Sequence, residues 1–177
     1  KFCSFSCSSF RNDKRLNIPL LLLRRFLGLK ITAQYNLEDM ADDVDGLLTH
    51  LNIEEAHVVG ISMGSMIAQI FASKYASRTK SLSLFMSNTG EIRTLVPKYK
   101  ALKALISIQK TTDRKEAQDN IVHLFSVIGS PKYPMNEKRL RELGGLAYDR
   151  GRHPRGFARQ LSATLASGNR SHWLSQI

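Results

Sequence analysis

The chain has 177 residues, of which 42% are hydrophobic and 23% charged, and its formal net charge at pH 7 is +11. This is the length of one ordinary domain, and the composition argues against intrinsic disorder. No run approaches the roughly 18 apolar residues of a membrane-spanning helix. The two cysteines, Cys3 and Cys7, cannot form a disulfide scaffold, and with no histidine nearby they predict no metal site.

The basic charge is dispersed along the chain. Residues 36–57 contain seven acidic residues and no Lys or Arg. Proteins that bind single-stranded nucleic acid typically contain Lys/Arg runs interleaved with aromatic residues. This sequence contains no such run. We therefore expect a basic, solvated surface and no nucleic-acid partner, with a nucleic-acid binder as a minor alternative.

The first part of the chain, residues 1–34, is an N-terminal segment of uncertain structure. The sequence begins with Lys1, and residues 1–11 lack the pattern of a secretory signal. We expect an internal piece of a longer, cytoplasmic protein. Residues 18–29 predict a short amphipathic helix, because Pro19 suits a first helical turn and two arginines interrupt the apolar run.

Residues 36–52 predict a well-defined amphipathic helix. Asn36 is a suitable N-cap, and Asp39 three residues later comes close to a capping box. Acidic residues crowd the first turns, where the helix dipole favours them. The apolar residues recur at helical spacing and form one face: Leu37, Met40, Val44, Leu47, Leu48 and Leu51.

The pattern then changes to alternating strands and helices. The β-branched run at 56–60 predicts a buried strand, residues 64–76 a helix, and residues 81–87 a second strand. The order helix, strand, helix, strand is typical of a parallel α/β architecture with right-handed crossovers.

The remainder of the chain predicts helices only. Apolar residues recur at helical spacing over four stretches, and no strand is predicted between residues 91 and 177; the four stretches are 94–110, 113–128, 136–148 and 154–167.

The motif with chemical content lies between the first strand and its helix. Gly60-Ile61-Ser62-Met63-Gly64 is a G-x-S-x-G sequence in a strand-to-helix context, as in a nucleophile elbow. The sharp turn would hold Ser62 in a strained conformation with its hydroxyl exposed, and side chains at the two glycines would collide. The Met63 N–H would be one oxyanion-hole donor. The alternative is a glycine-rich turn that binds either nothing or a phosphate.

Residues 35–90 resemble the central segment of α/β-hydrolase-fold serine hydrolases, most closely the esterase branch typified by aclacinomycin methylesterase. Residues 120–167 resemble the helical cap of that branch. The resemblance implies a partial α/β-hydrolase core over residues 35–90 and a cap over residues 91–177. Ser65 departs from the branch, which has a second glycine at this position, and we expect the change to be tolerated.

The resemblance implies hydrolysis of a carboxylic ester, or a related acyl transfer, with Ser62 as nucleophile and no metal or organic cofactor. The apolar faces of the cap suggest a hydrophobic small-molecule substrate. The family's triad order of Ser, acid and His implies that the acid and the histidine lie beyond residue 177. Later acidic residues and histidines in the chain are expected to be surface or cap residues: Asp113, Asp119, Asp149, His123, His153 and His172. The alternative is a catalytically inactive fragment or pseudoenzyme that acts as a binding module.

Overall fold

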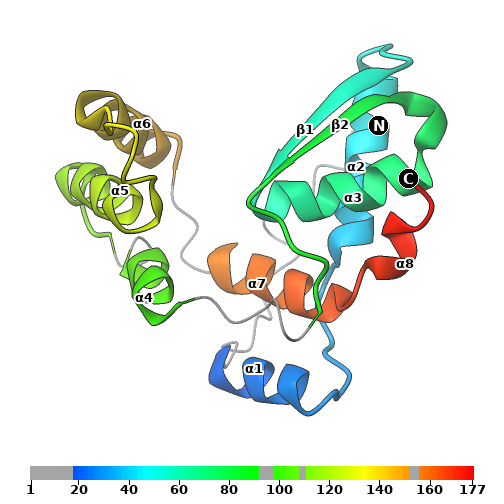
Figure 1. The fold of residues 1–177 in the computed structure, drawn as a ribbon, viewed down its shortest axis with the longest axis horizontal. Helices are drawn as coiled ribbons and strands as arrows, with labels where there is room; N and C mark the ends of the chain where they lie inside the picture. The colour runs from blue at the N-terminus through cyan, green and yellow to red at the C-terminus, as the bar shows by residue number, and fades with distance from the viewer. Residues whose placement is uncertain (1–17, 92–97, 108–110, 152–155) are drawn as a thin grey trace. The chain divides into compact units, whose positions relative to one another are not determined.

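The computed structural model of the protein describes residues 18–91, 98–107, 111–151 and 156–177 (Figure 1). The chain divides into two compact units: residues 1–92 together with 158–177, and residues 93–157. The first unit contains the mixed α/β part, and the second is helical in its described residues. The assignment of residues 91–177 as a cap stays a prediction.

The first unit follows the predicted alternation of helices and strands. No strand is found between residues 91 and 177 within the described ranges, as predicted. The elements of this unit are α1 (Ile18–Phe26), α2 (Leu37–His50), β1 (Ala56–Ile61), α3 (Met63–Lys74), the 3₁₀ turn η2 (Ala76–Arg78), β2 (Thr79–Phe85), the greater part of α7 (Gly156–Ser167) and α8 (Ser171–Leu174).

The start of α2 is determined by its own sequence. The Asn36 side chain accepts hydrogen bonds from the backbone N–H groups of Glu38 (2.6 Å) and Asp39 (3.1 Å). The Asp39 carboxylate in turn accepts from the Asn36 N–H at 2.8 Å, which completes a capping box. The predicted N-cap is confirmed.

The two strands are parallel neighbours in register, from His57 opposite Ser81 to Ile61 opposite Phe85. Side chains alternate between the faces of a strand. Val58 and Gly60 face α3, whereas His57, Val59 and Ile61 face the other way and are exposed. One face of the described sheet is therefore covered by α3 and the other is open.

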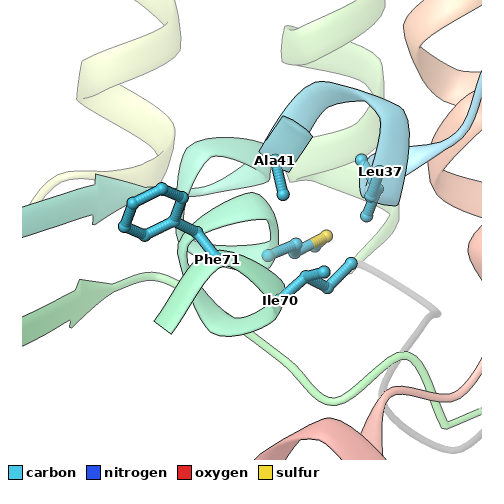
Figure 2. Close-up of a cluster of buried hydrophobic side chains, with 5 residues drawn as sticks. Leu37, Ala41, Ile70 and Phe71 are labelled. Carbon is cyan, nitrogen blue, oxygen red and sulfur yellow. The ribbon is translucent and has the colours of Figure 1, made fainter. Parts of the chain in front are cut away.

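The core of this unit lies between α2 and α3 (Figure 2). Leu37 and Ala41 from α2 and Phe71 from α3 have no exposed surface. Each fully buried large apolar side chain contributes about 1.5–3 kcal/mol to folding. Met66 and Ile70 complete the cluster. Leu37, Met40, Val44 and Leu48 of the predicted apolar face thus pack at the contact with the helix that follows β1. The prediction is wrong for Leu47 and Leu51, which are exposed.

Charged side chains join the same two helices at the surface. Lys74 Nζ lies 2.6 Å from Asp42 Oδ1, and the Tyr75 hydroxyl donates to the same oxygen at 2.8 Å. Burial raises the pKa of Asp42, but the hydrogen bonds from Lys74 and Tyr75 outweigh it and lower that pKa below 3.8. The hydrogen bond to Asp42 raises the pKa of Lys74. We call these three side chains the α2–α3 clasp.

The second unit is built from α4 (Tyr99–Ser107), α5 (Arg114–Ile128) and α6 (Glu137–Asp149). Helices α5 and α6 approach closely because Gly144 has no side chain. A Cβ at this position would lie 2.9 Å from Ala117 O and 2.8 Å from Ile121 Cγ2. Arg114 and Arg141 form ion pairs across the two helices, with Asp149 and Asp119 respectively.

Within the described ranges, no helix is long and apolar enough to cross a membrane.

The α2–α3 clasp predicts a specific pH dependence of stability. The contribution of Asp42 is complete above pH 3.8 and is lost as the pH falls through its lowered pKa. We expect Asp42→Asn to reduce the free energy of unfolding at pH 7 by at most about 1 kcal/mol, because both partners are partly in water. Urea unfolding at pH 7 and pH 3 measures this difference, which should shrink at the lower pH. Asp43→Asn, on an exposed neighbour, is the control; an equal loss in that variant would contradict the assignment.

The open sheet face predicts self-association of a protein made of residues 1–177. The exposed fractions of Val59, Ile61 and Phe85 are 64%, 62% and 54%, and such apolar patches and unpaired strand edges favour association. We expect low stability or oligomers in size-exclusion chromatography with light scattering, and a shift toward monomer in Val59→Lys. A monomer with a cooperative unfolding transition would contradict this expectation.

Candidate active site

The end of β1 is in close contact with the first turn of α3. Gly60 is buried, and a Cβ at this position would lie 2.5 Å from Gly64 O and 2.6 Å from Ser65 Cα. Both contacts are with backbone atoms, which cannot rotate away. Glycine at position 60 is therefore required for the helix to pack against the strand end, as the sequence predicted.

The prediction of a similar collision at Gly64 is wrong. A Cβ at Gly64 would have no atom within 4 Å beyond the backbone of its own helix. The reason is geometric: Gly64 lies within α3 with its missing side chain directed into open space, whereas Gly60 lies beneath the helix. The steric requirement for glycine falls on Gly60 alone of the two motif glycines.

Ser62 lies at the turn itself, in a conformation uncommon for a residue with a side chain. Its φ is 55° and its ψ −121°, and it is the N-cap residue of α3. The Ser62 N–H donates to Phe85 O at 2.9 Å, and its carbonyl accepts from the N–H groups of Ser65 (3.0 Å) and Met66 (3.3 Å). These bonds hold the backbone in place and leave the Ser62 residue exposed. The predicted strain and exposure are both observed.

The first residues of α3 offer backbone donors beside Ser62. Met63 and Gly64 are the first two residues of the helix, so their N–H groups have no acceptor within it. In the described part of the chain neither group has another acceptor. The positive end of the helix dipole lies at the same place. This arrangement can stabilise a negative oxygen atom next to Ser62.

The acidic residues considered for a triad are engaged inside the helical unit. Asp113 is the N-cap of α5 and accepts from Glu116 N at 2.8 Å. Asp119 is paired with Arg141, and Asp149 with Arg114 at 3.0 Å. Their observed roles are capping and ion pairing.

The histidines are placed in several elements. His57 Nδ1 lies 2.8 Å from Ser81 Oγ across the strand pair, on the open face of the sheet. The His172 ring lies 5.0 Å from that of Trp173 in α8. His123 belongs to α5, and His153 lies outside the described residues. Between these histidines and the Ser62 hydroxyl, the described ranges show no hydrogen bond.

Another non-glycine residue with positive φ follows β2 and was not predicted from the sequence. Met86 has φ 54° and an exposed fraction of 65%. Because Ile61 pairs with Phe85, Met86 and Ser62 are the residues that follow the two paired strand ends. Only the strand register relates these two positions, which no local sequence pattern connects.

A buried arginine holds the loop that follows β2. Arg170 has an exposed fraction of 1% and donates to Gln69 Oε1 (3.2 Å), Asn88 O (2.9 Å) and Gly168 O (3.1 Å). Burial lowers the pKa of Arg170, and the charge of Arg25 lowers it further. These bonds tie the chain after α7 to α3 and to the end of β2.

Within the described residues, no group of three or more His, Cys, Asp or Glu side chains is placed to hold a metal ion.

The sequence model of the α/β-hydrolase fold family matches residues 5–106, which are more than half of the chain. The chain therefore belongs to the α/β-hydrolase fold family, and the expected fold class is confirmed.

Two individual proteins show similarity to the chain. RutD of Pantoea ananatis (strain LMG 20103), a proposed carbamate hydrolase, is 40% identical over 52 residues, which are 29% of this chain and 19% of that protein. A solved structure described as a marine microorganism esterase is 21% identical with a TM-score of 0.47, and the match covers 75% of this chain and 52% of that one. The chain thus spans about a fifth and about half of these two proteins.

The two motif glycines predict opposite responses to the same substitution. Gly60→Ala forces backbone atoms apart, and we expect it to lower the free energy of unfolding by about 1–3 kcal/mol. Gly64→Ala adds a methyl group in open space to a helix, and we expect no loss or a gain of up to about 1 kcal/mol. Denaturant unfolding of the two variants in parallel measures both effects. Equal destabilisation by the two variants would refute the packing described here.

Proposed function

We propose that the protein is a serine hydrolase of a carboxylic ester, with Ser62 as the nucleophile. The observation that supports it is the conformation of Ser62: exposed, at φ 55°, between a strand end and the N-terminus of α3. A strained turn of this kind presents the hydroxyl to a substrate while the backbone stays fixed. Membership of the α/β-hydrolase fold family is consistent with this role.

The proposed reaction has two steps. Ser62 Oγ attacks the ester carbonyl carbon, its proton passes to a histidine, and the carbonyl oxygen becomes an oxyanion held in part by the Met63 N–H. Collapse of this intermediate expels the alcohol, which takes the proton from the histidine, and leaves an acyl group on Ser62. Water then attacks the acyl-enzyme by the same route and releases the acid.

We propose that the histidine and its acidic partner lie beyond residue 177. Three acidic residues after Ser62 already have structural roles: Asp113 caps α5, and Asp119 and Asp149 form ion pairs. The order Ser, acid, His in enzymes of this fold agrees with this placement. We propose in addition that the enzyme belongs to the branch typified by aclacinomycin methylesterase and acts on an apolar ester. The exposed Met86 side chain, which follows the strand paired with β1, supports this preference.

Covalent labelling by a serine-directed alkyl phosphonate tests the proposal. In the protein made from its complete reading frame we expect rapid labelling at Ser62 and none in Ser62→Ala, because the phosphonate reacts only with an activated serine hydroxyl. Peptide mass spectrometry locates the modified residue. A protein made of residues 1–177 alone should label slowly, since it lacks the proposed base.

Three other outcomes of this labelling experiment are informative. Rapid, Ser62-dependent labelling of residues 1–177 would show that a working base lies within them. Labelling that persists in Ser62→Ala would place the nucleophile elsewhere. Absence of labelling in the complete protein would favour the alternative of an inactive chain that acts as a binding module.

A further inference from the structure

The Ser65 hydroxyl lies at the junction of β1, β2 and α3. Ser65 has no exposed surface. Its Oγ lies 2.5 Å from Gly60 O and 2.8 Å from Phe85 O, and it accepts a hydrogen bond from Phe85 N at 3.1 Å. One side chain of the first helical turn thus contacts the backbone at the ends of both strands.

These contacts use the proton of the Ser65 hydroxyl and one of the two lone pairs of its oxygen. A serine hydroxyl has one proton to donate and two lone pairs. It can donate to Gly60 O or to Phe85 O at any one time, while it accepts from the Phe85 N–H. Because the group is buried, water cannot replace these bonds, and removal of the hydroxyl takes one hydrogen-bond partner away from the backbone at the strand ends.

The same peptide groups hold the Ser62 turn. Phe85 O, which contacts Ser65 Oγ, accepts the hydrogen bond of the Ser62 N–H at 2.9 Å. Ser65 N in turn donates to Ser62 O at 3.0 Å. Ser65 is therefore connected to the two peptide groups that flank Ser62: directly to the Ser62 carbonyl at the helix start, and to the Ser62 N–H through Phe85 O at the end of β2.

We infer that Ser65 is a positioning residue for Ser62. A residue with a side chain stays at positive φ only when its surroundings determine it strongly, and the Ser65 hydroxyl adds bonds at this point that a glycine cannot make. The inference rests on the proposed role of Ser62 as nucleophile.

Two substitutions distinguish the effect of losing the Ser65 hydroxyl from the effect of weakening α3. Ser65→Ala and Ser65→Gly both remove the hydroxyl, but only glycine also weakens the helix, by about 1 kcal/mol relative to alanine. Effects of the hydroxyl should therefore be equal in the two variants. Ser83→Ala is the matched control, because Ser83 is an exposed serine of β2.

The first measurement is amide hydrogen exchange by NMR on the protein made from its complete reading frame. We expect the Ser62 and Phe85 amides to exchange about 10-fold faster in Ser65→Ala and Ser65→Gly. Amides in the middle of α2 should keep their protection, and Ser83→Ala should match the unchanged protein. Unaltered protection of Ser62 and Phe85 in both Ser65 variants would overturn the inference.

The second measurement is the phosphonate labelling rate as a function of reagent concentration, well below the melting temperature of each variant. We expect the maximal rate to fall about 10-fold in both Ser65 variants with the half-saturating concentration unchanged, because the nucleophile is misplaced and the binding surface is not. A purely structural role would lower the melting temperature and leave the rate of the folded protein unchanged, which would overturn the inference. If the unchanged protein does not label while exchange at Ser62 still depends on Ser65, the proposed function fails and the backbone role of Ser65 stands.

Discussion

The close approach of α3 to the end of β1 is the constraint on which the rest of the first unit depends. It requires that Gly60 have no side chain, because a Cβ would lie 2.5 Å from Gly64 O. With the helix this close, the chain must reverse within one residue, and Ser62 takes a positive φ to do so. The exposed position of Ser62 and the Met63 N–H, which has no acceptor among the described residues, both follow from this packing.

Helix α3 connects the candidate site to the core. Its first turn contacts the strand ends through Ser65, and its buried face packs against α2 through Ile70 and Phe71 (Figure 2). Gln69 of the same helix accepts from Arg170, which also holds the loop after β2. Support on several sides is what the proposed role of Ser62 as a nucleophile requires, since an error of about 1 Å in the position of a reacting group can cost a factor of about 100 in rate.

Local chemistry was sufficient to predict most elements from the sequence. Asn36 and Asp39 determine the start of α2 through a capping box, and the β-branched run at 56–60 corresponds to β1. The second strand was predicted at 81–87 and lies at Thr79–Phe85, a shift typical of element ends, which depend on pairing with a neighbouring strand. The collision predicted at Gly64 failed because it depended on the direction of a missing side chain, which the motif alone does not specify.

The sequence by itself determined the fold class, through the alternation of helices and strands and the capping residues of α2. It also determined the candidate nucleophile, Ser62, through the G-x-S-x-G motif. Only the tertiary structure decided which backbone groups hold Ser62 in place. Phe85 is brought to Ser62 by the parallel register of β1 and β2, and the Ser65 hydroxyl reaches Phe85 through the approach of α3. These contacts join residues 20 or more positions apart, and no local pattern encodes them, because they arise from packing between elements and not from the preferences of either segment.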